Sequence, residues 1–194
     1  VMQNDKVKYY YDILQEHEKE LKLKRAFDII CSLIMIIILS PVLIVLSVMI
    51  KLDSKGPVLF KQVRVTTYGR KFKIWKFRTM VNNADKLGTQ VTTKGDARIT
   101  RMGHLLRKVR LDELPQLFNV LKGDMTFVGT RPEVPKYTAH YTEEMMATFL
   151  LPAGVTSRTS IEYKDEEKLL ENAENADEVY INCLLYTSDA ADEA

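Results

Sequence analysis

The sequence predicts an α+β protein that is mostly helical. We expect an N-terminal re-entrant membrane segment, a helix-break-helix, packed on a small cytosolic domain with a β-hairpin and amphipathic helices. Three observations lead to this fold class. An almost wholly apolar run over 27–50 is interrupted by Ser40-Pro41. Two segments in which apolar and polar residues alternate then flank Tyr68-Gly69. A helix with Pro115 in its first turn is expected to begin near Asp112.

The chain divides into four expected parts. Residues 1–22 are typical of a charged amphipathic helix, and residues 23–51 form the re-entrant membrane helix. Residues 52–182 form a domain on the cytosolic face of the membrane. Residues 183–194 resemble the translation of a sequencing adapter, so we exclude them from the fold and interpret the natural sequence as cut near residue 182.

The apolar run carries one charge, Asp28, and is long enough to cross a bilayer. Pro41 removes a helical hydrogen bond, and each half alone is too short for about 30 Å of hydrocarbon at about 1.5 Å per residue. Basic residues flank both ends, whereas a spanning helix normally has more of them on one side. These are Lys22, Lys24, Arg25, Lys51, Lys55 and Lys61. We favour a segment that enters and leaves by the same face; a proline-kinked span and a buried core helix are the alternatives.

The pattern of apolar and polar residues after the membrane helix predicts a hairpin, a loop, a short strand and further helices. Residues 58–65 and 71–80 alternate as strands do, and Tyr68-Gly69 between them predicts a hairpin. Residues 81–100 are polar and are expected to form a loop with a short helix. Residues 125–128 predict a short strand. Further helices are expected over 99–110, 141–150 and 164–180.

Asp112 and Glu113 are the first candidates for chemistry. Pro115 is tolerated only in a first helical turn, and Lys122-Gly123 is a typical helix stop, so a helix is expected between them. Asp112 would then lie at the positive end of the helix dipole, beside free N–H groups. That setting favours an anionic ligand or a metal next to the carboxylate. An ordinary N-cap is the alternative role for Asp112.

Basic residues surround this carboxylate pair. Arg107 precedes it and Arg131 follows it, on either side of the helix and its following strand. Guanidinium groups bind phosphate oxygens bidentately, so carboxylates together with arginines indicate phosphate chemistry. A divalent cation bridging carboxylate and phosphate fits the same pattern. A solvated basic surface is the alternative for any single arginine.

Composition and the absence of certain motifs disfavour several classes of protein function. The net charge of +2 is too small to imply a nucleic-acid partner, and the two cysteines, Cys31 and Cys183, form neither a disulfide framework nor a zinc spacing. No Asp-x-Asp motif, glycine-rich dinucleotide turn or phosphate-binding loop of the Walker type is present. A classical metal-dependent glycosyltransferase and a nucleotide-fold enzyme are therefore disfavoured.

Several segments together resemble one family, the bacterial sugar transferases that act as monotopic phosphoglycosyl transferases. The match covers roughly residues 22–163, in order. Its pieces are Lys24-Arg25-Ala26-Phe27-Asp28, Ser40-Pro41, Gly56-Pro57-Val58, Lys76-Phe77-Arg78-Thr79-Met80, Asp96-Ala97-Arg98-Ile99-Thr100-Arg101 and, strongest, the run from Arg107 to Pro132 that contains Leu111-Asp112-Glu113-Leu114-Pro115-Gln116.

The resemblance implies transfer of a sugar 1-phosphate from a UDP-sugar to a polyprenyl (undecaprenyl) phosphate, with release of UMP. In that family the residue matching Asp112 is the nucleophile and contacts Mg²⁺, and the residue matching Glu113 is its acidic partner. Arg107, Arg131 and Arg78 match residues expected near the phosphates. The resemblance also implies membrane lipids as partners at the cytoplasmic face of the bacterial inner membrane, and it is compatible with a homodimer.

The sequence departs from the family pattern in two places, of which the first retains Arg131 and concerns only local rigidity and the second concerns the choice of sugar. Thr130-Arg131-Pro132 stands where many members have Pro-Arg-Pro, and residues 152–157 vary a motif that helps to choose the sugar. The transferred sugar and the glycoconjugate pathway therefore stay open. A rival function is a non-catalytic, membrane-anchored basic module that binds anionic lipid or a partner protein. Release of UMP from a UDP-sugar would separate the two.

Overall fold

The computed structural model describes residues 4–84 and 96–157. The expected helix over 164–180, residues 183–194 and most of the loop over 81–100 lie outside the described residues. The elements, in chain order, are α1 (Asp5–Glu16), α2 (Glu18–Asp53), β1 (Leu59–Thr66), η1 (Thr67–Gly69), β2 (Arg70–Phe77), α3 (Arg101–Lys108), η3 (Leu111–Glu113), α4 (Gln116–Lys122), β3 (Met125–Val128), α5 (Pro135–Thr138), η4 (Met145–Leu150) and β4 (Ala153–Thr156).

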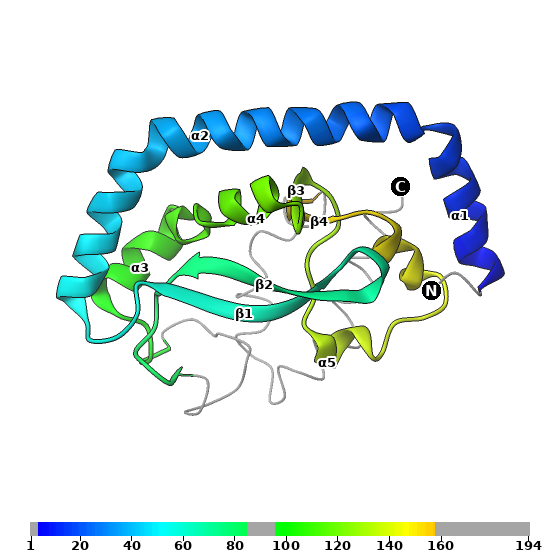
Figure 1. The fold of residues 1–194 in the computed structure, drawn as a ribbon. Helices are drawn as coiled ribbons and strands as arrows, with labels where there is room; N and C mark the ends of the chain where they lie inside the picture. The colour runs from blue at the N-terminus through cyan, green and yellow to red at the C-terminus, as the bar shows by residue number, and fades with distance from the viewer. Residues whose placement is uncertain (1–3, 85–95, 158–194) are drawn as a thin grey trace.

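The described part of the chain is mostly helical, as the sequence predicted, and it contains two small sheets. The hairpin β1–β2 lies on one side of α4, and α2 arches over the other side of α4 (Figure 1). The side chains between the hairpin, α4 and β3 form a buried core of Phe72, Ile74, Val120 and Met125. Helix α4 therefore occupies the middle layer, between the hairpin and the long helix.

The expected hairpin is present. β1 and β2 pair antiparallel, from Leu59 opposite Phe77 to Thr66 opposite Arg70. Its turn requires two residues in the left-handed region, Tyr68 at φ 57° and Gly69 at φ 76°. Glycine adopts this conformation without steric cost, which is why the Tyr-Gly pair marked the turn. The expected strand over 125–128 is also present, as β3.

The second sheet was not predicted from the sequence. β3 pairs in parallel with β4, with Met125 opposite Ala153 and Val128 opposite Thr156. The helix expected over 141–150 is instead the 3₁₀ helix η4 over its second part, Met145–Leu150. Within η4 the Thr148 hydroxyl donates to the carbonyl of Met145 at 2.7 Å, a local bond that competes with regular α-helix.

Helix α4 closes the free edge of β2 through Asn119. The Asn119 side-chain oxygen accepts from the Trp75 N–H at 3.0 Å, and its amide nitrogen donates to the Lys73 carbonyl at 2.9 Å. Asn119 is buried, so these bonds replace water on backbone groups that an edge strand leaves unpaired. α4 then ends at Gly123, φ 91°, as the sequence predicted.

The expected break at Ser40-Pro41 is a bend within one continuous helix. α2 runs without interruption from Glu18 to Asp53 with Pro41 inside it. Figure 1 shows that its two arms meet at a sharp bend between the part above α4 and the part that descends to α3. The prediction of two separate helices is wrong in this respect: Pro41 lies inside one continuous helix, where an internal proline is the usual cause of a bend but does not end the helix.

The first arm of α2 is fixed to the domain by polar side chains. Arg25 donates to the carbonyls of Val120 and Leu121, at 2.7 Å and 3.0 Å, in the last turn of α4. Asp28 is buried and accepts from the Thr126 hydroxyl at 2.6 Å. Lys24 also contacts the Thr126 hydroxyl. Asp28, the single charged residue of the apolar run, therefore faces the domain and binds β3.

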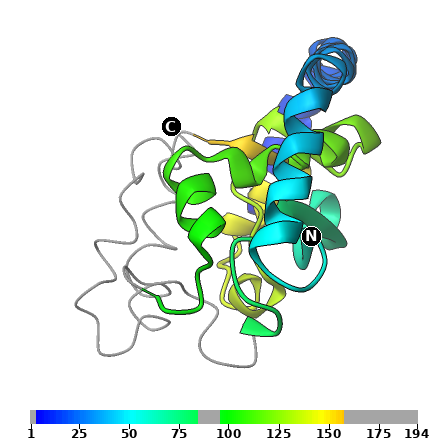
Figure 2. The ribbon, with the colours of Figure 1, turned by 90° about the vertical axis from the view of Figure 1, so that its left-hand side faces the viewer.

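The second arm of α2 is fixed to the same domain. Leu46 and Ile50 form a buried cluster with Phe77 of β2 and Leu106 of α3. Figure 2 shows this arm from the side, with α3 beside it. Both arms of the long helix therefore pack on one domain.

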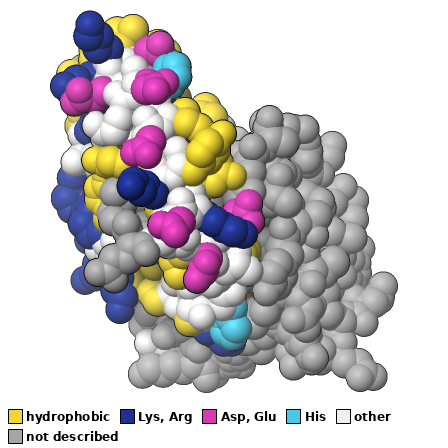
Figure 3. Space-filling model, turned by 90° about the vertical axis from the view of Figure 1, so that its right-hand side faces the viewer, with side chains coloured by type: hydrophobic (Ala, Val, Ile, Leu, Met, Phe, Trp, Pro, Cys, Tyr) yellow, Lys and Arg dark blue, Asp and Glu magenta, His cyan; other side chains and the backbone are white. Residues whose placement is uncertain are grey.

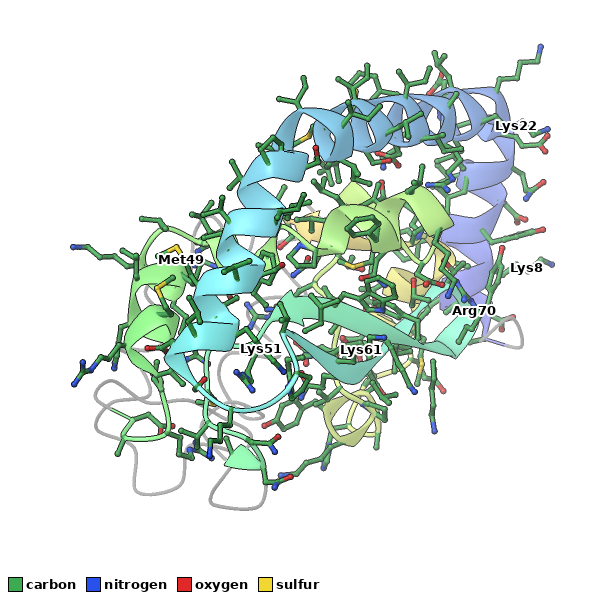
Figure 4. All side chains as sticks on the ribbon, turned by 60° about the vertical axis from the view of Figure 1, so that its left-hand side comes forward. Lys8, Lys22, Met49, Lys51, Lys61 and Arg70 are labelled. Carbon is green, nitrogen blue, oxygen red and sulfur yellow. The ribbon has the colours of Figure 1, made fainter. Side chains whose placement is uncertain are left out.

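The outward surface of α2 is apolar and exposed. By length and composition α2 could cross a membrane, and only 11% of its most apolar stretch is buried in the structure. Figure 4 shows side chains projecting outward along the helix, with Lys22 and Lys51 toward its opposite ends. A soluble core helix would be mostly buried, so that alternative for residues 27–50 is disfavoured.

Helix α1 is shorter than the expected helix over 1–22. It ends at Glu16, and residues from Glu18 onward already belong to α2. Val7 is its one fully buried side chain, and Asn4 donates to the Glu143 carbonyl at 2.8 Å beside η4. On the face shown in Figure 3, acidic and basic side chains are interspersed, which is typical of a surface in water.

Candidate active site

Asp112 and Glu113 lie in a tight 3₁₀ turn, η3, between α3 and α4. Arg110, at φ 54°, turns the chain into η3, and α4 begins only at Gln116 after Pro115. Leu111 and Leu114 pack against the buried cluster that contains Leu106, which anchors the turn. Asp112 is therefore not the N-cap of α4, and the interpretation of it as an ordinary cap is wrong.

Lys76 on β2 holds one of the two carboxylates. Its Nζ donates to the Oε1 of Glu113 at 2.7 Å, and both side chains are about one-quarter exposed, at 28% and 25%. Lys76 was not among the site residues predicted from the sequence. It lies in the matched Lys-Phe-Arg segment, but only the pairing of η3 with β2 brings it to Glu113.

The two carboxylates have opposite electrostatic settings. Burial alone would raise the pKa of Glu113, but the charge and hydrogen bond of Lys76, joined by Arg110 and Arg131, hold it below its usual value. Burial raises the pKa of Asp112 above its usual value; Lys76 and Arg107 oppose this, while the charge of Glu113 adds to it. Within the described residues Glu113 has an ion-pair partner and Asp112 has none.

Arg107 precedes the carboxylate pair in the sequence, and Arg131 follows it. Arg107 lies in the last turn of α3, and its Nε donates to the hydroxyl of Thr79 at 3.0 Å. Arg131 follows β3 and lies 3.7 Å, from its Nε, from the Oε1 of buried Glu133. Each lowers the pKa of one carboxylate, Arg107 that of Asp112 and Arg131 that of Glu113. The structure thus brings together four of the five predicted site residues.

Arg78 is placed differently from the expectation of a phosphate-binding residue. It is buried, and its guanidinium donates to main-chain carbonyls at the end of α2: to Lys55 at 2.8 Å, to Ser54 at 2.6 Å and to Ile50 at 3.4 Å. These bonds satisfy carbonyl groups that a helix end leaves unpaired. In the described structure, Arg78 therefore fixes the second arm of α2 to β2.

The arrangement can bind a phosphorylated ligand. Lys76, Arg107, Arg110 and Arg131 supply positive charge around two half-buried carboxylates. The residues also fit a divalent cation, because burial disfavours the charge of Asp112 and a cation beside it would relieve this. Among the described residues no cluster of three or more His, Cys, Asp or Glu is present. Mg²⁺ is commonly held by one or two carboxylates together with substrate phosphates, which requires no larger cluster.

A carboxylate pair within a cationic shell, on a domain fixed to an exposed apolar helix, defines the class: a membrane-associated protein with an acidic site surrounded by cationic side chains. The chain belongs to the bacterial sugar transferase family, whose model matches residues 19–191.

Three relatives illustrate the family. The chain is 46% identical, over 63% of its length, to a UDP-N-acetylgalactosamine-undecaprenyl-phosphate N-acetylgalactosaminephosphotransferase of Aeromonas hydrophila. It is 41% identical, over 78% of its length, to a UDP-glucose:undecaprenyl-phosphate glucose-1-phosphate transferase of Klebsiella pneumoniae. It is 39% identical, over 69% of its length, to an undecaprenyl-phosphate galactose phosphotransferase of Salmonella typhimurium. The matches span 29%, 33% and 31% of these relatives. The three act with different sugars, so the likeness does not single out one.

Proposed function

We propose that this protein transfers a sugar 1-phosphate from a UDP-sugar to undecaprenyl phosphate, releasing UMP, as the first membrane step of glycoconjugate synthesis. The observation that carries the proposal is the half-buried carboxylate of Asp112, which forms no ion pair with the residues that the structure describes, beside the Lys76–Glu113 ion pair. The three relatives cited above are named as undecaprenyl-phosphate sugar phosphotransferases, which supports the same reaction.

In the first half-reaction Asp112 is the nucleophile. An oxygen of its carboxylate attacks the phosphorus next to the sugar, and the bond from that phosphorus to the bridging oxygen breaks. UMP leaves with the bridging oxygen, and the sugar phosphate stays on Asp112 as an acyl phosphate. The absence of an ion pair on Asp112 in the described structure fits this role, because a carboxylate held by a lysine would be less free to attack.

In the second half-reaction an oxygen of the lipid phosphate attacks the same phosphorus and releases the Asp112 carboxylate. Glu113, held by Lys76 and kept ionised, orients the lipid phosphate or accepts its proton. Arg107 and Arg131 offset charge on the phosphoryl oxygens. Asp112 would also hold Mg²⁺, which supplies further charge neutralisation at the phosphates when bound.

The contacts of α2 support a re-entrant arrangement, and the resemblance to the family implies that the domain lies at the cytoplasmic face. Arg25 binds one arm to α4, and Arg78 binds the end of the other arm to β2. A span would separate the two ends of the apolar segment by about 30 Å of hydrocarbon. One domain that holds both ends fits a helix that dips into one leaflet and returns. The kinked span is the alternative that the topology experiment below addresses.

The test is incubation of the purified protein with Mg²⁺, undecaprenyl phosphate and a panel of UDP-sugars. UMP release with a subset of the sugars supports the proposal and identifies the donor. Labelled sugar phosphate should remain on the protein when the lipid acceptor is omitted. If UMP forms without trapped label and initial-rate plots intersect, transfer is direct and the covalent step is wrong. If no UDP-sugar yields UMP, the basic binding module becomes the better account.

A further inference from the structure

A close backbone contact joins the two strands of the second sheet next to Arg131. The Gly129 N–H donates to the Thr156 carbonyl at 3.1 Å, and the Gly154 N–H donates to the Thr130 carbonyl at 2.7 Å. The chain that leaves β3 therefore stays bound to β4 as far as Thr130. Arg131, the arginine that acts on Glu113, is the next residue.

This contact leaves no room for a side chain on either glycine. A Cβ at Gly154 would lie 2.3 Å from the Gly129 carbonyl oxygen and 2.4 Å from the Gly129 nitrogen. A Cβ at Gly129 would lie 2.6 Å from the carbonyl oxygen of Pro152. Distances under 3.0 Å are essentially never seen for real Cβ atoms, so a backbone would have to move. Neither glycine has a positive φ, so the requirement is for space alone.

The chain is fixed again immediately after Arg131. The Pro132 carbonyl accepts from the Nη1 of Arg64 at 2.9 Å, and the Glu133 carbonyl accepts from the Val65 N–H at 2.9 Å. β1 thus holds the segment on one side of Arg131, and β4 holds it on the other. The position of the Arg131 Cα is set by these two attachments.

We propose that Gly154 is a positioning residue for the donor diphosphate, acting through Arg131. Its missing side chain lets Gly129 and Thr130 lie against β4, and this close approach fixes the backbone from which Arg131 extends toward Glu133 on the Glu113 side of the site. This inference rests on the proposed function, in which Arg131 contacts the phosphates of a UDP-sugar. It assigns a role in donor binding to β4, the segment in which this sequence departs from the family pattern.

The experiment is a double-mutant cycle of Gly154→Ala and Arg131→Ala, with kcat/KM for the UDP-sugar as the readout. Gly154→Ala should lower kcat/KM about tenfold or more, the size of a lost charge-assisted hydrogen bond. In the Arg131→Ala background, Gly154→Ala should cause no further loss of kcat/KM, because the side chain that Gly154 positions is absent. Val128→Ala is the matched control: Val128 lies on β3 beside Gly129, is 61% exposed and should change kcat/KM less than about twofold.

Losses that multiply in the double variant would show a general disturbance and overturn the inference, as would a Gly154→Ala protein with normal kcat/KM. Circular dichroism checks that each variant folds. If Gly154→Ala does not, Gly129→Ala replaces it, because its nearest contact, 2.6 Å to the Pro152 carbonyl oxygen, is less severe than the contacts of 2.3 Å and 2.4 Å at Gly154. Failure of both to fold would assign the glycines to stability instead. A wild-type protein that releases no UMP would refute the proposed function, and this inference with it.

Discussion

The hydroxyl of Ser40 donates a hydrogen bond of 2.8 Å to the carbonyl oxygen of Ile37. In a regular helix that carbonyl would accept from the N–H of residue 41, which Pro41 lacks. Ser40 therefore satisfies the acceptor that its neighbour leaves unpaired. An unsatisfied carbonyl in hydrocarbon costs several kcal/mol, so this bond removes a penalty that the proposed re-entrant arrangement would otherwise carry.

Replacing Ser40 and Pro41 with Ala and Leu should straighten α2. The apolar part of the variant helix, of about 24 residues, would be straight and long enough to span a bilayer. The contacts of Arg25 and Arg78 could then no longer form on one domain. We expect loss of activity and altered accessibility of the two ends of the helix in intact cells.

Single-cysteine labelling measures this topology. Lys22→Cys and Lys55→Cys are made separately in a protein whose Cys31 and Cys183 are replaced by serine. With the natural Ser40-Pro41 pair, both sites should be protected from an impermeant reagent in intact cells and should react after lysis. External labelling of one site in that background would contradict the re-entrant arrangement and favour a kinked span.

The parts of the fold that depend on local rules could be predicted from the sequence. The Tyr68-Gly69 turn and the Gly123 helix stop both need positive φ, and glycine marks such positions. The continuity of α2 through Pro41 could not be predicted from the usual effect of proline, which is worth about 3 kcal/mol or more against a helix. The pairing of β3 with β4 could not either, because four-residue strands distant in sequence carry little periodicity.

Asp112→Asn should abolish turnover, with kcat lowered at least about a thousandfold, because an amide cannot form the acyl phosphate. Glu113→Gln should be severely impaired, but by less. The measurement is UMP release together with trapping of labelled sugar phosphate on the protein, which Asp112→Asn should not show. Asp12→Asn, an exposed acid on α1, is the control and should behave as wild type. Near-normal activity of Asp112→Asn would contradict the covalent mechanism.

The same substitution should stabilise the fold at neutral pH. Burial raises the folded pKa of Asp112 above its unfolded value, so the folded state loses stability as the pH rises through that pKa. Asparagine carries no charge and avoids this loss. Asp112→Asn should therefore melt at a higher temperature than wild type at pH 7 without Mg²⁺. The difference should shrink below about pH 4, where the unfolded carboxyl is protonated as well. A lower melting temperature at pH 7 would contradict the assignment.

The acidic residues of the candidate site could be predicted from the sequence, but not all of its cationic residues could. Asp112 and Glu113 stand out because two carboxylates adjoin a helix start in one short stretch. Lys76 and Arg78 lie two residues apart on one segment, yet one reaches Glu113 and the other reaches the end of α2. Only the packing of η3 and α2 against β2 separates these roles, so a sequence motif alone could not assign them.

Lys76→Met should move the acidic limb of the pH profile of kcat/KM to higher pH. Lys76 lowers the pKa of both carboxylates, so its removal raises both, and a higher pH is then needed to ionise them. Lys73→Met is the matched control: it removes the same charge from an exposed position on β2 and should leave the limb in place. The comparison uses the midpoint of the limb, because loss of a phosphate contact would lower the rate at every pH without moving that midpoint. An unchanged midpoint in Lys76→Met would show that the ionisation of Asp112 and Glu113 does not limit the reaction in this pH range.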